Sequence, residues 1–486
     1  MAVVTAPVLR NRIGGAWDEP AGVELQDVPD PATGEVIARV PLSDAGAVDR
    51  AVIAAATAQP EWAAVPVAER VRVCYRLREL MVAQAQELRD LIVRENGKTR
   101  DDAQGEVRRA VEVVELACGM PTLMMGRVLA DVSRGIDTEE IRYPVGVCGV
   151  ITPFNFPLMV PMWTLPLAIA AGNAVVLKPS ERTPNSAVRI VELFEAAGLG
   201  PGLLNIVHGA RAVVTAICEH PGIRAVSFVG SQPVAAYVYR TASAHGKRVQ
   251  ALAGAKNHLV VMPDADLGVT VPAIMSSAFG GAGQRCLAGS VVVAVGEAGD
   301  RVVGALARAS EGLRVGPGAD PETGMGPLIR DDSRSRVTRY IEAGLREGAR
   351  LVCDGRSAVG GDESGGFFLG PTIFDGVTPS MTIAREEIFG PVLSVVRTVD
   401  LEEALAVVNA SRFGNAASIF TTSGGAARRW REGVQAGMLG VNIGVAAPVA
   451  MFPFAGWKDS FYGDLHATGL DGVQFFTRRK VVTSRF

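Results

Sequence analysis

The sequence has few cysteines and no long uninterrupted apolar run. Its six cysteines among 486 residues include no Cys-x-x-Cys pair, which argues against a disulfide framework or a zinc site. Any special cysteine is therefore expected to act as a thiol, with no metal. No stretch of about 18 residues lacks a charge, proline or glycine, so no transmembrane helix is expected. Residues 1–15 lack the features of a secretory signal, and we expect a cytoplasmic protein.

The sequence also lacks a dense basic block. Its 48 basic and 51 acidic residues give a formal charge of -3, so nucleic acid is not an expected partner. Hydrophobic residues make up 48% of the chain and charged residues 20%, which is typical of a globular protein. The length predicts two or three domains.

Apolar periodicity predicts an α/β protein. Asp44 to Arg100 is interpreted as two amphipathic helices, the second ended by Gly97. Short β-branched runs alternating with helical segments then predict a parallel, doubly wound sheet, with strands at 145–151, 174–177, 204–207 and 224–229. A second α/β region is expected from Leu252, with strands at 259–262, 291–295 and 392–396. The β-rich end, 480–483, is expected to pair outside the core, for example with a second subunit.

Cys286 is the candidate nucleophile. It lies in Phe279-Gly-Gly-Ala-Gly-Gln-Arg-Cys-Leu-Ala-Gly289, where small residues permit close approach of backbone and substrate. The adjacent Arg285 favours a reactive thiolate. A lone cysteine is more often a small buried hydrophobe, and that interpretation is preferred for Cys74, Cys118, Cys218 and Cys353.

A candidate oxyanion donor follows the first parallel strand. Asn155 lies in Thr152-Pro-Phe-Asn-Phe-Pro157, in a loop at the carboxyl end of a strand, where α/β proteins place ligands. Two aromatic residues and two prolines would hold its amide in one orientation, as an oxyanion donor requires. The alternative is an ordinary turn residue.

Two further loops suggest a dinucleotide. Lys178 and Glu181 follow the next strand and could bind ribose hydroxyls, while the carboxylate would repel a 2′-phosphate. The alternative is an exposed ion pair. Phe228-Val-Gly-Ser231 is a strand-to-helix turn whose small residues could approach a pyrophosphate.

Taken together, these motifs resemble the aldehyde dehydrogenase superfamily, and within it the methylmalonate-semialdehyde dehydrogenases that acylate coenzyme A. The resemblance runs from about Gly15 to the C-terminus. Its most specific parts are Tyr143-Pro-Val-Gly-Val, Thr152-Pro-Phe-Asn-Phe-Pro157, Lys178-Pro-Ser-Glu-Arg182, Ser227-Phe-Val-Gly-Ser231, Gly254-Ala-Lys-Asn-His258, Gly283-Gln-Arg-Cys286 and Glu386-Glu-Ile-Phe-Gly-Pro391.

The resemblance implies roles for individual residues. Cys286 would be the nucleophile, and Asn155 with the backbone N–H of Cys286 would form the oxyanion hole. Lys178 and Glu181 would hold the adenine ribose of NAD. The same cofactor site would include Thr152, Phe154, Arg182 and Ser231, and Glu387 and Phe389 would position the nicotinamide ribose and ring.

The resemblance also implies an aldehyde dehydrogenase-like fold. A Rossmann-type NAD-binding domain would comprise residues 1–126 and 146–251, an α/β catalytic domain 252–459, and a small β oligomerisation arm 127–145 and 460–486. A homodimer or homotetramer is expected.

Two positions depart from the superfamily pattern. Ala235 replaces a common glycine after Ser231, which weakens the expected pyrophosphate contact. Hydrolytic members carry a Glu four residues before the motif lysine, whereas this chain has Leu252 before Lys256, and no Glu occurs between Glu219 and Glu297.

The missing Glu favours acyl transfer to coenzyme A as co-substrate over hydrolysis. The predicted reaction is oxidation of malonate or methylmalonate semialdehyde through a Cys286 thioester, with decarboxylation, to acetyl-CoA or propionyl-CoA, CO₂ and NADH. A hydrolytic dehydrogenase acting on another aldehyde is the main alternative, and a non-catalytic structural or binding protein is a remote one.

Two arginines are candidates for the substrate carboxylate. Arg285 adjoins the nucleophile, and Arg109 matches an arginine characteristic of the resembling subfamily, on a predicted helix over 106–117. Either could bind a carboxylate through charge-assisted hydrogen bonds. The alternative for each is a structural ion pair.

Overall fold

The computed structural model describes residues 6–19, 22–357 and 365–486. Where two helices were expected in 44–100, the chain forms three: α1 (Ala45–Ala64), α2 (Val67–Ala83) and α3 (Ala85–Asn96). The prediction was wrong because a break near Gln84 divides the second helical run, with the Gln84 backbone N–H bonding back to Leu80. Gly97 ends α3 in the left-handed conformation, as expected.

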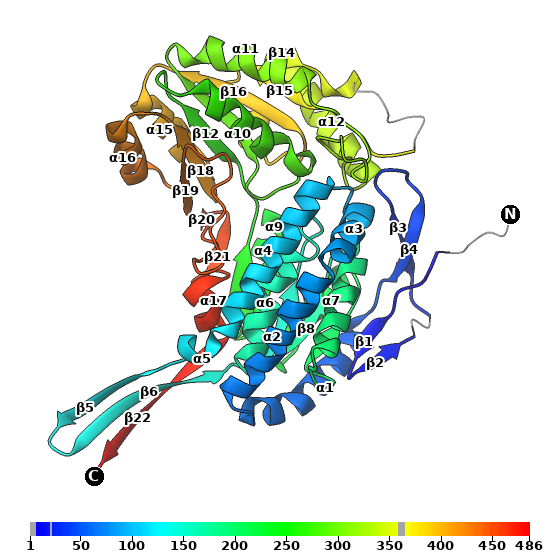
Figure 1. The fold of residues 1–486 in the computed structure, drawn as a ribbon, viewed down its shortest axis with the longest axis vertical. Helices are drawn as coiled ribbons and strands as arrows, with labels where there is room; N and C mark the ends of the chain where they lie inside the picture. Colours follow the sequence, from blue (N-terminus) through cyan, green and yellow to red (C-terminus); the bar gives the residue numbers. More distant parts are fainter. Residues whose placement is uncertain (1–5, 20–21, 358–364) are drawn as a thin grey trace.

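An eight-stranded sheet forms the first part of the molecule (Figure 1). Its order is β2 (Ala16–Asp18), β1 (Asn11–Ile13), β9 (Leu204–Ile206), β8 (Ala174–Lys178), β7 (Val147–Ile151), β10 (Ile223–Val229), β11 (Arg248–Leu252) and β21 (Phe461–Gly463). The strands β9-β8-β7-β10-β11 are parallel, which confirms the predicted sheet. The helices of this part are α4 (Arg100–Cys118), α5 (Met120–Leu123), α6 (Met159–Ala170), α7 (Asn185–Ala196), α8 (Arg211–Glu219) and α9 (Gln232–Ala244).

The strand order creates a switch point between β7 and β10. The chain moves outward from β7 through β8 to β9, then returns to the other side of β7 with β10. In open parallel sheets, ligands bind in the crevice beyond the carboxyl ends of the strands at such a point. The loop that carries Asn155 begins there.

A second, seven-stranded sheet forms the other large part. Its order is β14 (Arg350–Cys353), β15 (Thr372–Asp375), β16 (Val392–Thr398), β13 (Gly289–Val295), β12 (Asn257–Val261), β18 (Ala416–Phe420) and β19 (Met438–Val441), and only the β14–β15 pair is antiparallel. Its helices are α10 (Leu267–Phe279), α11 (Ala298–Glu311), α12 (Asp331–Arg346), α14 (Thr382–Arg385), α15 (Leu401–Ala410) and α16 (Gly424–Gly433). Each sheet has its own buried apolar cluster.

A three-stranded antiparallel arm projects from the molecule (Figure 1). It consists of β22 (Thr477–Arg485), β6 (Ile136–Pro144) and β5 (Arg127–Ser133). The terminal strand was expected to pair outside the core, and within this chain it pairs with β6. Segment 461–463, predicted to belong to the arm, instead pairs with β11 of the first sheet. The domain ranges as a whole stay a prediction.

Smaller elements complete the described chain. They are the hairpin β3 (Leu25–Pro29) and β4 (Val36–Pro41), the pair β17 (Phe413–Gly414) and β20 (Trp457–Lys458), and α17 (Gly469–Phe475). Across the described ranges, no helix is both long and apolar enough to cross a membrane.

Candidate active site

Cys286 lies where two cavities meet. The first, which we call the switch-point cavity, has a volume of about 520 Å³ and is formed by the loops beyond β7, β8 and β10 together with α12 and residues near Glu387. The second, the α4 cavity, has a volume of about 320 Å³ and lies between α4 and residues 445–454. Cys286 and Phe156 line both. A thiol there can react with a group that enters from either side.

The loop before Cys286 requires small residues. Gly281, Ala282 and Gly283 adopt φ values of 57°, 53° and 70° in succession, a conformation that L side chains rarely adopt. A Cβ on Gly283 would lie 2.3 Å from the carbonyl oxygen of Gly390. The nucleophile loop therefore packs directly against the backbone of the Glu386–Pro391 segment.

Two asparagines hold the peptide of Cys286. The side-chain amides of Asn257 and Asn415 each donate a hydrogen bond of 2.8 Å to the carbonyl oxygen of Cys286. Asn257 also donates to the carbonyl of Ala288 and accepts from the N–H of Ala416. Asn257 belongs to a motif recognised in the sequence, whereas nothing in the sequence singled out Asn415.

The environment of Cys286 keeps its thiol protonated. Burial, and then the negative charge of Glu387, raise the pKa of the Cys286 thiol to about 12, against the smaller opposing effects of the Cys286 and Leu287 N–H groups and of Arg285. Arg285 acts in the predicted direction, but the predicted thiolate is not the resting form, because desolvation outweighs the single nearby cation.

Asn155 is buried beside Cys286, in the loop after β7. Its Nδ2 donates to the carbonyl of Gln284 at 3.0 Å, two residues before the cysteine. The second N–H of this amide has no acceptor in the part of the chain that the structure describes. The loop is fixed by Asn96, whose Nδ2 donates to the carbonyl of Phe154 at 2.9 Å. This amide can donate a hydrogen bond to an oxygen formed near the thiol.

Lys178 and Glu181 lie in the switch-point cavity as an ion pair, with Nζ and Oε2 2.9 Å apart. The side chains are only 7% and 26% exposed, so this is not the exposed pair of the alternative interpretation. Burial opposes ionisation of Glu181, but the charge and hydrogen bond of Lys178 outweigh it and lower the pKa of Glu181. The cavity therefore contains a carboxylate that stays ionised near neutral pH.

Thr152, Phe154, Arg182 and Ser231 also line this cavity. Arg182 forms an ion pair of 3.1 Å with Asp332 and lies over the ring of Phe154. Asp332, Ser333 and Arg336 of α12 complete this wall. Sequence reasoning missed these three, because α12 follows a long connection and no motif marks its polar face.

Glu387 and Phe389 close the cavity near Cys286. Oε1 of Glu387 accepts the N–H of Ala255 at 2.9 Å, and a Cβ on Gly254 would lie 2.6 Å from Oε2. Burial raises the pKa of Glu387. Phe389 has φ +54° and meets the ring of Phe154 edge-on at 5.8 Å, so backbone strain is stored where the sequence predicted a binding contact.

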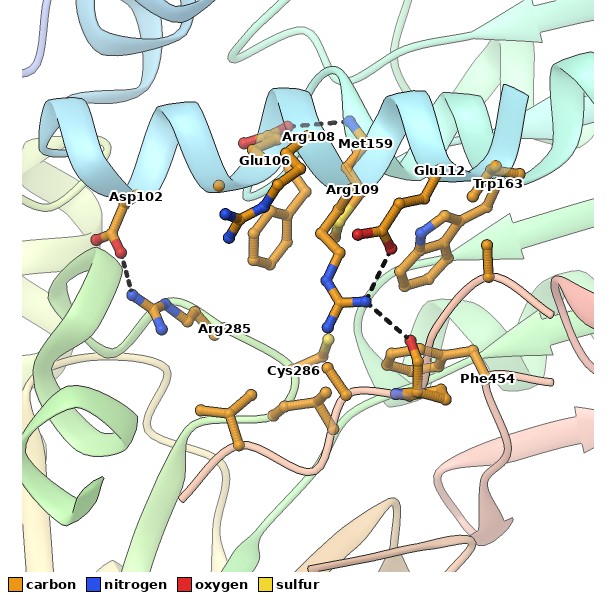
Figure 2. Close-up of a pocket in the computed structure, with 18 of the residues that line it drawn as sticks. Asp102, Glu106, Arg108, Arg109, Glu112, Met159, Trp163, Arg285, Cys286 and Phe454 are labelled. Atoms are coloured by element: carbon orange, nitrogen blue, oxygen red, sulfur yellow. Dashed lines mark hydrogen bonds and ion pairs between the residues drawn. The ribbon is translucent and has the colours of Figure 1, made fainter. Parts of the chain in front are cut away.

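The two candidate arginines lie in the α4 cavity, and both are paired (Figure 2). Nη1 of Arg109 contacts Glu112 at 2.9 Å and the carbonyl of Pro448 at 3.4 Å. Nη2 of Arg285 contacts Asp102 at 2.5 Å. Each guanidinium keeps further N–H groups, so the two interpretations, structural pair and carboxylate ligand, both fit the geometry.

All twelve site residues predicted from the sequence, Cys286 among them, thus line one or both of the cavities that meet at Cys286. Residues 17–482 match the model of the aldehyde dehydrogenase family. The chain is 56% identical over 478 residues to malonate-semialdehyde dehydrogenase 2 of Geobacillus kaustophilus, covering 98% of this chain and 99% of the relative.

Two solved structures are similar throughout. The methylmalonate-semialdehyde dehydrogenase of Oceanimonas doudoroffii has a TM-score of 0.97 at 46% identity, covering 99% of this chain and 98% of that one. A protein of Sinorhizobium meliloti 1021, provisionally named methylmalonate-semialdehyde dehydrogenase and complexed with NAD, has a TM-score of 0.98 at 44% identity and covers 99% of both chains.

The charge of Glu387 should control the reactivity of Cys286 in the ligand-free protein. Replacing Glu387 by Gln removes a negative charge that raises the thiol pKa, so alkylation of Cys286 by iodoacetamide at pH 8 should become faster, by roughly twofold for each half unit by which the pKa falls. Glu386→Gln removes the same charge one residue away and serves as the control. An unchanged or slower rate in Glu387→Gln would show that its charge does not act on the thiol.

Proposed function

Since this chain belongs to the aldehyde dehydrogenase family, we propose that it oxidises malonate or methylmalonate semialdehyde with NAD⁺ and coenzyme A. The products are acetyl-CoA or propionyl-CoA, CO₂ and NADH. The observation that carries this proposal is the position of Cys286, which lines both cavities. The names of the relatives support the choice of semialdehyde.

The switch-point cavity fits NAD. Lys178 and the ionised Glu181 would hold the hydroxyls of the adenine ribose, and Glu387 with Phe389 would hold the nicotinamide end close to Cys286. Ser231, the N-cap of α9, and Val234 line this cavity, so the N–H groups of this helix end, apart from Pro233 which has none, can bind the pyrophosphate. NAD⁺, when bound there, accepts the hydride from the aldehyde carbon.

The chain supplies a nucleophile and an oxyanion site. The Cys286 thiol transfers its proton to water, its sulfur forms a bond to the aldehyde carbon, and the electrons of the C=O π bond move to the oxygen, which becomes an oxyanion. The free N–H of Asn155 and the backbone N–H of Cys286 stabilise that oxygen. After loss of the hydride, the acyl group remains on Cys286 as a thioester.

Transfer to coenzyme A resolves this thioester. Hydrolysis needs a base that activates water, and such a base contributes roughly 3 to 5 kcal/mol to lowering the barrier. Leu252, at the end of β11, is apolar and buried and cannot act as one. A thiol is intrinsically more nucleophilic than water and needs less assistance.

The substrate carboxylate accounts for the loss of CO₂. Arg109 and Arg285 line the α4 cavity, where their remaining N–H groups can bind the carboxylate of the semialdehyde. Oxidation leaves this carboxylate β to the thioester carbonyl. The bond to the carboxyl carbon then breaks, its electrons form an enolate that the oxyanion site stabilises, and protonation gives the shortened acyl group.

The arm suggests how subunits associate. Val128, Leu129 and Val132 of β5 and Val481 of β22 are exposed apolar side chains on the two edge strands. We propose that these edges join copies of the chain into a homodimer or homotetramer, because exposed strand edges readily pair. Small-molecule substrates, with no nucleic acid, complete the proposed set of partners.

Cys286→Ala should abolish turnover while NAD⁺ binding is kept. The change deletes the nucleophile but leaves Lys178, Glu181 and Glu387 in place. Initial rates and isothermal titration with NAD⁺ measure the two properties separately. Cys353→Ala, which changes another partly exposed thiol, should leave both unchanged. Normal activity in Cys286→Ala would refute the assignment.

NAD should be strongly preferred over NADP. The ionised Glu181 would face the 2′-phosphate, and its repulsion should lower kcat/KM for NADP by at least about tenfold. Glu181→Gln should narrow this preference, mainly by improving the use of NADP. Equal efficiency of the wild type with both cofactors would disprove the proposed contact.

The two arginines should discriminate between aldehydes. If they bind the carboxylate, Arg285→Leu and Arg109→Leu should each reduce kcat/KM for malonate semialdehyde about tenfold or more, and that for propanal by no more than about twofold. Arg100→Leu removes the same charge from the same helix at an exposed position that does not line the cavity, and is the matched control. Equal losses with both aldehydes would support structural ion pairs instead.

Pre-steady-state kinetics should separate acylation from acyl transfer. Without coenzyme A, rapid quench should show a burst of NADH close to one equivalent per Cys286, followed by slow turnover. Coenzyme A should accelerate the second phase and leave the burst unchanged, because it acts after hydride transfer. Fast steady turnover without coenzyme A, with the free acid as the main product, would establish the hydrolytic alternative.

A further inference from the structure

Asp102 joins α4 to the nucleophile loop through two different contacts. Its Oδ1 lies 2.5 Å from Nη2 of Arg285, and its Oδ2 accepts the backbone N–H of Gly281 at 2.9 Å. One carboxylate thus binds a side chain and the backbone of a single loop, at two points four residues apart. The backbone N–H of Asp102 donates to Oγ1 of Thr99, the N-cap of α4. The Asp102 side chain is therefore attached to a well-ordered first turn of the helix.

The guanidinium of Arg285 packs closely against the backbone of this loop. A Cβ on Gly280 would lie 1.9 Å from Nη2 of Arg285, so only glycine permits this close packing. The side chain is 14% exposed and lines the α4 cavity with Cys286. The pairing with Asp102 occupies Nη2, and the remaining N–H groups can donate to a ligand.

The three other acidic residues of the cavity are arranged differently. Glu106 is buried, pairs with Lys98 and accepts backbone N–H groups, and contacts neither candidate arginine. Glu112 pairs with Arg109 from one turn away on the same helix, a contact that does not fix the helix to another element. Asp101 is exposed, lines the same cavity, and has no ion-pair partner among the described residues. Asp102 is therefore the acidic residue of this cavity that pairs with a candidate arginine from a different structural element (Figure 2).

We propose that Asp102 is a positioning residue that sets the selection of acidic aldehydes. It holds the Arg285 guanidinium against the Gly280–Gly281 backbone, so that the free N–H groups meet the substrate carboxylate at a fixed distance from Cys286. A fixed guanidinium forms its hydrogen bonds with less loss of side-chain freedom than a mobile one. This inference rests on the proposed function, because it assumes that Arg285 binds the carboxylate.

Asp102→Asn removes the charge that positions Arg285 and keeps the size of the side chain. The amide has the same shape and its oxygen can still accept the N–H of Gly281, but it lacks the charge that holds Arg285. The KM for malonate semialdehyde should rise about tenfold, with kcat changed less, while kcat/KM for propanal stays within about twofold. Glu115→Gln breaks an exposed ion pair of the same helix, with Arg78, outside the cavity, and should change kcat/KM for neither aldehyde by more than about twofold.

Two readouts show that the loop itself is intact. The rate of Cys286 alkylation by iodoacetamide and the melting temperature should be similar in Asp102→Asn, Glu115→Gln and wild type. Asp102→Ala also loses the contact with Gly281, and should therefore reduce activity on propanal as well. Asp102→Glu, which keeps the charge, should restore part of the preference for the acidic aldehyde.

Arg285→Leu, measured in the same series, shows whether a negative result concerns the positioning role of Asp102 or carboxylate recognition by Arg285. If Arg285→Leu lowers the malonate semialdehyde-to-propanal ratio of kcat/KM and Asp102→Asn does not, Asp102 only neutralises charge and the positioning role is overturned. If Arg285→Leu leaves that ratio unchanged, carboxylate recognition by Arg285 fails, and this inference fails with it. A higher ratio in Asp102→Asn than in wild type would also contradict it.

Discussion

The fixed peptide of Cys286 is the constraint on which the rest of the site depends. Two side-chain amides, from Asn257 and Asn415, converge on one carbonyl oxygen. One hydrogen bond would satisfy that buried oxygen, so the second serves to orient it. The two bonds fix the peptide between Cys286 and Leu287, and so they hold the backbone directly beside the Cys286 N–H that is half of the proposed oxyanion site. Gly283 in the loop before Cys286 allows the backbone of this loop to pack against that of Gly390.

Desolvation sets the chemistry of the resting protein. Burial raises the pKa of the Cys286 thiol and that of Glu387, and it lowers the pKa of Lys256 to about 7. Nζ of Lys256 is buried and has no hydrogen-bond partner among the described residues. Charges are thus expensive near the nucleophile, which favours a thiol protected from indiscriminate reaction until substrate and cofactor are bound.

Much of this arrangement could be predicted from the sequence, for physical reasons. Apolar runs bounded by turn residues gave the strands β7, β8, β9 and β10, and their carboxyl-end loops carry Asn155, Lys178 and Ser231. Contacts between distant segments could not be predicted. Asn415 and Arg336 belong to the part of the chain that forms the second sheet and its helices, and no local sequence pattern marks them as site residues. The split between α2 and α3 and the pairing of residues 461–463 with β11 were missed because both depend on tertiary packing that overrides local periodicity.

The thiol pKa was predicted in the wrong direction, because a neighbouring arginine is visible in the sequence but burial is not.

The central claim is that Cys286, which lines both cavities, carries the acyl group between oxidation of the aldehyde and transfer to coenzyme A. The most direct measurement is mass spectrometry of the intact protein after mixing with NAD⁺ and malonate semialdehyde, followed by peptide mapping. Without coenzyme A, an acetyl group should accumulate on Cys286, and addition of coenzyme A should remove it with formation of acetyl-CoA. An unmodified Cys286 during ongoing NADH formation, or an acyl group that leaves at the same rate with and without coenzyme A, would contradict the account.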